Sequence, residues 1–405
     1  MDRTILHCDL NGFYASVECL FRPELKSVPM AVCGSVENRH GIILAKNELA
    51  KGYGIVTAET VWQAKKKCPE LVTVTPHHGE YGKYSCIVNA IYERYTDRVE
   101  PFGIDESWLD VTGGGDGRQI ADELRETVKR EVGLTISVGV SFNKVFAKLG
   151  SDYKKPDATT VISRENYRDI VWPLPVSALL YAGKAATHAL ESIGITTIGQ
   201  LAACSRQATA DKLGKMGEML FDFACGLDDS PVAVAGEHAA PKSVGNGMTF
   251  KRNLTGLEDI HAGVAALADT VSSRLRRYDL KCGTVQVTIR DPQFKTIQRQ
   301  KKLSAPTNQQ KEITDAAMEI IRASWNLRAP IRMLTVTGQA LSSGEEQQLC
   351  LFGGEADPAH RKRERIERAV DQIRGKYGRD AISLAVSIRE DIGVGHLAHH
   401  GDEDE

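Results

Sequence analysis

The sequence predicts a multidomain α+β protein, and three observations point to this fold class. The chain has 405 residues, enough for two to four domains that each bury a core. Residues 4–141 and 242–340 each alternate strand-like and helix-like hydrophobic spacing. Residues 165–232 show helical spacing with two glycine-centred turns. We therefore expect two mixed α+β parts with a helical module between them.

The composition excludes several other protein classes. Hydrophobic residues make up 42% and charged residues 26% of the chain, as in ordinary globular proteins. No apolar run approaches the ~18 residues of a membrane span, and the first residues lead into a strand rather than a signal-peptide core. The nine cysteines are scattered and never spaced as Cys-x-x-Cys, which favours reduced thiols over disulfides or zinc ligands. We expect a cytoplasmic protein without membrane contact.

The first mixed part begins with a buried strand at 4–9 that leads into a helix at 12–21. Residues 22–78 hold short strands and helices interrupted by glycines, as in an inserted subdomain. The remaining elements are a helix at 81–96, strands at 99–104 and 107–111, a helix at 118–131 and a strand at 134–141. Without the insert, this order is a ferredoxin-like βαββαβ unit, an antiparallel sheet with helices on one face.

The second mixed part carries most of the positive charge. We expect strands at 243–252, 284–290, 294–302 and 332–337 and helices at 259–277 and 309–325. Residues 241–340 hold 16 Lys and Arg against 8 Asp and Glu, whereas the segments before and after each carry a net charge of −5. The ordinary alternative is a solvated surface, but alternating strands aim side chains at a common face, which favours a polyanion partner. The basic residues expected to bind it are Arg290, Lys295, Arg299, Lys301 and Lys302.

Three carboxylates are expected to converge in the first mixed part. Asp9 ends the first strand, and Asp105 and Glu106 lie at the tip of the hairpin that should pair with it. Like charges this close favour a cation, and two Mg²⁺ ions are the usual apparatus for in-line attack at phosphorus. The alternatives are a helix N-cap for Asp9 and a hydrogen-bonded turn for Asp105 and Glu106. Lys144 and Lys148, four residues apart on a helix, could clamp a phosphate or be merely solvated.

Three segments resemble the sequence signatures of Y-family DNA polymerases. They are DLNGFYASVE at 9–18, FGIDESWLD at 102–110 and SVGVSFNKVFAKLGSD at 137–152. The likeness runs from about residue 4 to 352 and is nearest the bacterial polymerase IV (DinB) and UmuC-like (ImpB/MucB/SamB) branches. Three long motifs in order are far more specific than one short pattern.

The resemblance implies a right-hand polymerase with named subdomains. The parts implied are a palm at 1–21 and 79–164, fingers at 22–78, a thumb at 165–232, a linker at 233–241, a little finger at 242–340, and a clamp-binding peptide with a charged tail at 341–405. The implied function is template-directed nucleotidyl transfer to a primer 3′-hydroxyl, used for synthesis past damaged template in DNA repair and the SOS response.

The resemblance also implies roles for single residues in the palm. Asp9, Asp105 and Glu106 would be catalytic and hold two Mg²⁺ ions, with the Leu10 carbonyl as a further ligand and Mn²⁺ as a possible substitute. The other implied roles are a steric gate for Tyr14, an aromatic neighbour for Phe13, a triphosphate contact for Lys148 and a place beside the metals for Ser107. The ordinary alternative for Tyr14 is an aromatic core contact.

The insert departs from the family pattern. Many members carry Tyr-x-x-Arg for the triphosphate, whereas this chain has Glu48 and Lys51 at those positions. Lysine cannot form the bidentate contact of an arginine fork, so Lys51, together with Lys46, should bind phosphate more loosely. Ile42 and Leu44 fall where the family often has small residues above the templating base. These larger side chains should reduce the range of damaged template bases that the site accommodates.

Two shorter motifs concern the partners. Gly183 and Lys184 resemble the family's helix-hairpin-helix, which presents backbone amides to phosphates, although Tyr181 and Ala182 replace the usual glycine-hydrophobic pair. Residues 348–352 look like the peptide that binds the bacterial sliding clamp; its contact residues would be Gln348, Leu349, Leu351 and Phe352. The alternative for Gly183 and Lys184 is a plain helical turn, and the alternative for residues 348–352 is a segment folded back on its own domain.

A charged helix is expected at 357–377, after this peptide. The resemblance also implies a monomer that acts on primer-template DNA with dNTPs.

Two other functions compete with the polymerase. The first is a different two-metal enzyme on a ferredoxin-like palm, a nucleotidyl transferase or a cyclase, which would convert nucleotides without a template. A non-catalytic accessory factor with a degenerate palm would bind DNA and the clamp without incorporating nucleotides. The basic domain and the clamp-like peptide oppose the first alternative, and the intact Asp9, Asp105 and Glu106 oppose the second.

Overall fold

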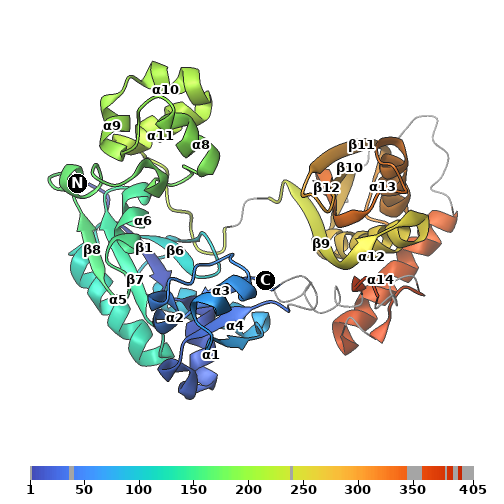
Figure 1. The fold of residues 1–405 in the computed structure, drawn as a ribbon, viewed down its shortest axis with the longest axis horizontal. Helices are drawn as coiled ribbons and strands as arrows, with labels where there is room; N and C mark the ends of the chain where they lie inside the picture. Colours follow the sequence, from blue (N-terminus) through green and yellow to red (C-terminus); the bar gives the residue numbers. More distant parts are fainter. Residues whose placement is uncertain are drawn as a thin grey trace. The chain divides into compact units, whose positions relative to one another are not determined.

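The chain forms two compact units (Figure 1). The computed structural model describes residues 2–35, 41–237, 240–343, 358–378, 381–385 and 391–394. The first unit holds Met1–Val32 and Ile43–His238, and the second holds Cys33–Ile42 and Ala239–Glu405. The separation after residue 238 falls inside the segment expected to be a linker.

A five-stranded sheet organises the first unit. Its order is β5-β6-β1-β7-β8, with β8 parallel to β7 and the other neighbours antiparallel. The strands are β1 (Ile5–Leu10), β5 (Val99–Pro101), β6 (Glu106–Asp110), β7 (Ile136–Ser141) and β8 (Thr159–Ile162). The order of the first four confirms the expected ferredoxin-like unit. The edge strand β8 was not predicted, because four residues carry little periodic signal.

Helices cover both faces of this sheet. α4 (His78–Tyr92) and α5 (Gly117–Val132) pack on one face, where Leu6, Cys8 and Leu10 of β1 lie in the core beneath them. α6 (Lys144–Tyr153) packs on the other face over β1, β7 and β8. The sequence analysis expected helices on one face only, and α6 corrects that detail. Because side chains alternate along a strand, β1 directs His7 and Asp9 toward the α6 face.

Glycine permits the close approach of α6 to the sheet. A Cβ atom added to Gly139 of β7 would lie 1.8 Å from the carbonyl oxygen of Ala147, and one added to Gly150 of α6 would lie 2.9 Å from the Cα of Gly139. Asn143 starts the helix, since its side-chain oxygen accepts a hydrogen bond from the amide of Phe146 at 2.8 Å. The backbone contact therefore fixes the height of α6 above β1.

The predicted insert forms a small subdomain around a three-stranded sheet of order β3-β2-β4. Its elements are η1 (Pro23–Ser27), β2 (Met30–Cys33), β3 (Ile43–Lys46), α2 (Glu48–Gly52), α3 (Val61–Lys67) and β4 (Val72–Val74). Met30, Val32 and Val74 pack against Ala15 and Cys19. These two come from α1 (Phe13–Phe21), so α1 joins the insert to the main sheet.

The helical module predicted for 165–232 is also present, and its core continues into side chains of α6 and β8. Its helices are α7 (Tyr167–Ile170), η2 (Val176–Ala178), α8 (Lys184–Glu191), α9 (Ile198–Ala203), α10 (Arg206–Leu213) and α11 (Lys215–Ala224). Tyr181 adopts a left-handed φ of 66°, a conformation that glycine adopts more easily. The turn before α8 therefore carries a cost in backbone strain at Tyr181.

The second unit is a four-stranded antiparallel sheet of order β11-β10-β12-β9 with two helices on one face. Its elements are β9 (Ser243–Leu254), α12 (Gly256–Arg277), β10 (Leu280–Arg290), β11 (Thr296–Thr307), α13 (Gln310–Ser324) and β12 (Ile331–Ser343). Every element predicted between 243 and 337 is present, although β10, β11 and β12 are longer than expected. Val285, Val287 and Ile289 are buried as predicted.

The C-terminal part of the chain returns to the second unit. α14 (Pro358–Tyr377) confirms the charged helix expected at 357–377. Farther along, Ile392 and Val394 are almost completely buried in the core of this unit, and the amide of Lys251 donates to the carbonyl of Ile392 at 3.2 Å. Residues 391–394 are therefore anchored to the edge strand β9.

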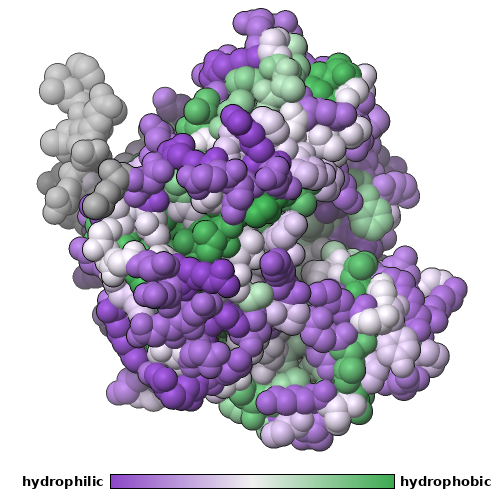
Figure 2. All heavy atoms as spheres, turned by 90° about the vertical axis from the view of Figure 1, so that its left-hand side faces the viewer, coloured by the Kyte–Doolittle hydropathy of each residue, from purple (hydrophilic) through white to green (hydrophobic). Residues whose placement is uncertain are grey.

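Hydrophilic residues cover most of the face drawn in Figure 2, and the apolar patches on it are small and separate. In the part of the chain that the structure describes, no helix is both long and apolar enough to cross a membrane.

We predict that Gly139→Ala destabilises the first unit. The added methyl group would overlap the carbonyl oxygen of Ala147, so α6 must move outward or the strand must bend. Overpacking of this kind costs about 1–3 kcal/mol. Urea unfolding measures the effect, with Gly79→Ala as the control because its methyl group meets no atom within 4 Å. Equal stability of the two variants would contradict the prediction.

Candidate active site

Strand pairing brings the predicted carboxylates to one end of the sheet. β1 and β6 are antiparallel with Asp9 directly opposite Glu106, and the amide of Leu10 donates to the carbonyl of Asp105 at 2.9 Å. Directly opposite residues on adjacent strands point to the same face, so Asp9 and Glu106 both face α6. Asp9 is buried and Glu106 is partly buried.

Two lysines from the α6 region neutralise these carboxylates. Lys155, just after α6, lies with its Nζ atom 2.7 Å from Asp9 Oδ2 and 2.7 Å from Asp152 Oδ1. Lys148 forms an ion pair with Glu106. Lys148 was expected near the site from the sequence, whereas Lys155 was not. The spacing of Asp152 and Lys155 at i, i+3 near the end of a helix was the available signal.

Burial and mutual repulsion perturb two of the three carboxylates in the same direction. Burial raises the pKa of Asp9 to about 6; Lys155 opposes this shift, while Glu106 and Asp105 add to it. Burial, followed by the charge of Glu106, also raises the pKa of Asp105. A divalent cation would relieve both effects, because it favours the ionised form and supplies the opposite charge.

Glu106 behaves differently because two basic side chains lie beside it. Burial alone would raise the pKa of Glu106, but the adjacent His7 ring and the ion pair with Lys148 outweigh burial and lower the pKa to about 2. Glu106 is therefore ionised at neutral pH, whereas the pKa of Asp9 lies closer to neutral pH.

His7 supports Glu106 from inside the sheet, a position that the sequence analysis missed. Its side chain is fully buried, with Nδ1 2.8 Å from Ser151 Oγ and Nε2 3.3 Å from Glu106 Oε2. The ring meets Trp108 edge-on at 5.3 Å, and burial lowers the pKa of His7, which favours a neutral ring. Alternation along β1 was the signal available, because it places His7 on the same face as Asp9.

Oxygen ligands on a shared face suit Mg²⁺ or Mn²⁺ chemically. Among the described residues, however, no group of three or more His, Cys, Asp or Glu side chains has the geometry of a bound metal. Asp9 and Glu106 instead turn toward Lys155 and Lys148. The donor set fits a divalent metal that would compete with these lysines.

Two neighbours of the site differ from expectation. Lys144 does not share the location of Lys148: its Nζ lies 2.6 Å from Glu100 Oε1 and 4.4 Å from the centroid of the Trp108 ring. Ser107 points to the opposite face of the sheet, where its hydroxyl donates to Asn89 at 2.7 Å. Lys144 is thus buried in a local ion pair, and Ser107 does not face the carboxylates.

Aromatic side chains line the start of α1. The Tyr14 ring stacks on Tyr81 with centroids 4.0 Å apart and meets His78 edge-on at 5.9 Å. Phe13 is buried in the core, whereas Tyr14 is partly exposed. Gly12 precedes them at a φ of 53°, and a Cβ there would lie 3.2 Å from the Lys46 carbonyl. The loop between β1 and α1 therefore approaches the insert closely.

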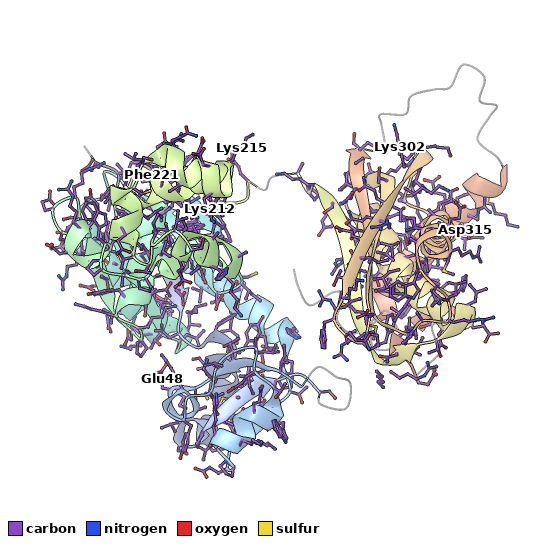
Figure 3. All side chains as sticks on the ribbon, turned by 45° about the horizontal axis from the view of Figure 1, so that its top comes forward. Glu48, Lys212, Lys215, Phe221, Lys302 and Asp315 are labelled. Atoms are coloured by element: carbon purple, nitrogen blue, oxygen red, sulfur yellow. The ribbon has the colours of Figure 1, made fainter. Side chains whose placement is uncertain are left out.

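The departures from the family pattern lie on the short helix α2. Glu48 and Lys51 are largely exposed and lie 3.5 Å apart, and the Glu48 side chain points away from its subdomain (Figure 3). Lys46 is partly buried, with its Nζ 3.2 Å from Thr57 Oγ1. Ile42, just before β3, is exposed, and Leu44 is partly buried.

The expected DNA-contact residues divide between different surfaces. Gly183 caps α8, and Lys184 begins that helix on the surface. In the second unit, Arg290 and Lys302 lie on the open face of the sheet, and Lys302 projects outward from β11 (Figure 3). Arg299 and Lys301 lie opposite Val287 and Val285 and so face the helix side, where Lys301 pairs with Glu319. This register corrects the expectation of one common basic face.

Lys295 lies in the turn before β11, where its amide donates to Asp291 at 2.9 Å. The clamp-like peptide with Gln348, Leu349, Leu351 and Phe352 lies outside the described residues.

Comparisons with known proteins agree over nearly the whole chain. A profile of the impB/mucB/samB family matches residues 8–152, and the profile of that family's C-terminal domain matches residues 241–351. The chain is 47% identical over 395 residues to DNA polymerase IV of Acetivibrio thermocellus, covering 96% of this chain and 98% of that protein. It is 36% identical over 397 residues to DNA polymerase IV 2 of Halalkalibacterium halodurans, covering 96% and 95%.

The fold is also found among solved structures. A Y-family DNA polymerase chimera aligns with a TM-score of 0.73 at 21% identity, covering 84% of this chain and 99% of that chain. This similarity shows a shared fold.

We predict that Asp9→Asn stabilises the metal-free protein above pH 6. The pKa of Asp9 is raised to about 6 by folding, so ionisation costs stability as the pH rises from about 4 through 6. The asparagine avoids this cost, roughly 1–3 kcal/mol at pH 8, and should give no gain near pH 4.

Urea unfolding in EDTA at pH 4 and pH 8 measures the difference. Adding Mg²⁺ at pH 8 should then stabilise the wild type more than the variant. A stability difference that is the same at both pH values would contradict the prediction.

Proposed function

The chain belongs to the impB/mucB/samB family and is a Y-family, translesion DNA polymerase, so we propose that Asp9, Asp105 and Glu106 hold the divalent metal ions of its nucleotidyl transfer. Dependence on a divalent metal and the use of primer-template DNA and dNTPs follow from this membership. The resemblance found in the sequence and the expected right-hand fold are confirmed. That the ions are two Mg²⁺, with Mn²⁺ as a substitute, is our proposal.

The observation that carries this site is the direct pairing of Asp9 with Glu106, with Asp105 adjacent. Bound there, two metal ions would lower the pKa of the primer hydroxyl and neutralise the leaving pyrophosphate. The chain's own residues supply position: His7 and Ser151 orient Glu106, and the Leu10 carbonyl would complete the ligand set. Catalysis then consists mainly of alignment and electrostatics.

We assign the incoming nucleotide to the space between α1, the insert and α6. Tyr14, braced by Tyr81, would exclude a 2′-hydroxyl, and Phe13 would support it. Lys148 and Lys155 would turn from Glu106 and Asp9 to the triphosphate once metal neutralises the carboxylates. Lys51 would add a weaker contact, since it already lies near Glu48. Ile42 and Leu44 would contact the templating base.

The subdomains then take the names that the resemblance supplied. We propose a palm at 1–21 and 79–164, fingers at 22–78, a thumb at 165–232, a linker at 233–241 and a little finger at 242–340. Gly183 and Lys184 of the thumb and Arg290, Lys295 and Lys302 of the little finger would contact the DNA backbone. Arg299 and Lys301 would contact DNA only past the edge of β11, because they face the helix side.

Three further proposals rest on the sequence alone. Residues 348–352 would bind a sliding clamp of the bacterial type through Gln348, Leu349, Leu351 and Phe352. The polymerase would act as a monomer held by that clamp. DNA as the substrate supports a cytoplasmic location.

We predict that the wild type adds template-matched dNTPs to a primer with Mg²⁺ and that Asp105→Asn loses at least ~10³-fold in rate. Single-nucleotide primer extension measures this, with Asp97→Asn as the control because Asp97 is an exposed carboxylate of the same subdomain. Template-independent turnover would favour a cyclase-like enzyme. DNA binding without incorporation by the wild type would favour the accessory factor.

We predict that Lys155→Met raises KM for dNTP about tenfold, because an ammonium group that contacts phosphate contributes roughly 1–2 kcal/mol. Single-turnover extension over a range of dNTP concentrations separates this effect from a change in kcat. Lys154→Met removes the same charge one residue earlier on an exposed side chain and should leave KM unchanged. Equal KM values for both variants would exclude Lys155 from the triphosphate site.

A further inference from the structure

α14 is docked onto the little finger through a buried arginine. The Arg276 side chain of α12 is only 7% exposed and forms ion pairs with Glu367 and Asp371 of α14, the latter at 2.5 Å. Its Nη1 also donates to the carbonyl of Asn308 at 2.9 Å. Arg374 of α14 returns the contact by pairing with Asp269 at 2.9 Å. Because removing one partner of a buried ion pair is costly, the helix has a fixed orientation on the domain.

This docking divides the charges of α14 between two sides. The acidic residues Glu364, Glu367 and Asp371 are all partly buried; the last two pair with Arg276, and Glu364 pairs with Arg368 at 2.9 Å. The exposed charged side chains described on α14 are all basic, namely Lys362, Arg365, Arg368 and Lys376. These four extend over about 21 Å of helix at 1.5 Å per residue. We call them the α14 strip.

A crevice adjoins the strip. It lies between α12 and α14 with a volume of about 450 Å³, and Arg276, Arg277, Arg368 and Arg374 contribute to its walls. Three of these arginines already form ion pairs: Arg276 with Glu367 and Asp371, Arg374 with Asp269, and Arg368 with Glu364. Ser273, Asn308 and Gln372 add polar groups. Arg368 belongs to both the crevice and the strip, so the two surfaces meet at this residue.

We propose that the α14 strip and the adjoining crevice bind the phosphate backbone of duplex DNA, as a second DNA-contact surface of the little finger. α14 packs on the helix side of the sheet, whereas Arg290 and Lys302 lie on the open face, so one straight duplex segment cannot contact both. The proposal rests on the polymerase function, because that function makes DNA the polyanion that the chain meets. Arginine and lysine side chains recognise phosphate without reading sequence, which suits an enzyme that works on any template.

The salt dependence of DNA binding tests the proposal. The full-length triple variant Lys362→Gln, Arg365→Gln, Lys376→Gln removes three charges of the strip. The matched control Lys311→Gln, Arg322→Gln, Arg328→Gln removes three exposed charges elsewhere on the same unit. Kd for a 40-base-pair duplex is measured by fluorescence anisotropy between 50 and 300 mM KCl. Each lost phosphate contact should lower the slope of log Kd against log salt by about 0.9.

We expect the strip variant to lower the slope by about 2.7, that is about 0.9 for each of the three charges, and to raise Kd at least about tenfold at 150 mM, with a change below twofold in Kd for the control. A wild-type slope in the strip variant, or equal losses in the two variants, overturns the proposal and leaves an acidic protein surface as the partner of the strip. Equal thermal midpoints show that both variants fold. Primer extension by the wild type in the same buffer tests the polymerase function separately.

Discussion

Carboxylates held close together in a partly dry environment are the constraint on which the first unit depends. Asp9, Asp105 and Glu106 raise one another's free energy of ionisation, and the fold must supply positive charge without blocking the site. α6 does this, because Lys148 and the following Lys155 reach the carboxylates from above the sheet. Long flexible side chains can withdraw when a metal enters, which a buried arginine fork would do less readily.

That electrostatic solution requires a particular packing. Lys148 and Ser151 reach Glu106 and His7 only if α6 lies almost in backbone contact with β7, and Gly139 makes this approach possible. Gly139 allows α6 to lie close to the sheet, and this position lets Lys148 and Lys155 reach the carboxylates. Their closeness in the sequence, within one strand-helix unit, reflects this shared requirement.

The parts of the fold and site that the sequence predicted are those encoded locally. The buried apolar run of β1, the alternation along β10 and the helical spacing of α12 predicted these elements. The order of strands predicted that Asp9 would lie close to Asp105 and Glu106, as the pairing of Asp9 with Glu106 shows. The sequence could not predict which distant side chain each residue contacts, because that depends on how the strands and helices pack. Lys144 turned to Glu100, and Lys301 turned to Glu319, because the register across strands and the positions of helices decide these contacts. Strand β8 was not predicted, because four residues are too few to show a periodic pattern.

The C-terminal segment shows how tertiary contacts change the meaning of a sequence pattern. A charged helix near a chain end usually has no fixed partner, yet one buried arginine gives α14 an inner and an outer side. β12 ends at Ser343 and α14 begins at Pro358, so the clamp-like peptide at 348–352 is tethered at both ends to one domain. If these residues bind a clamp, as we propose, the attachment of both flanking elements to one domain would couple clamp binding to the placement of that domain on DNA.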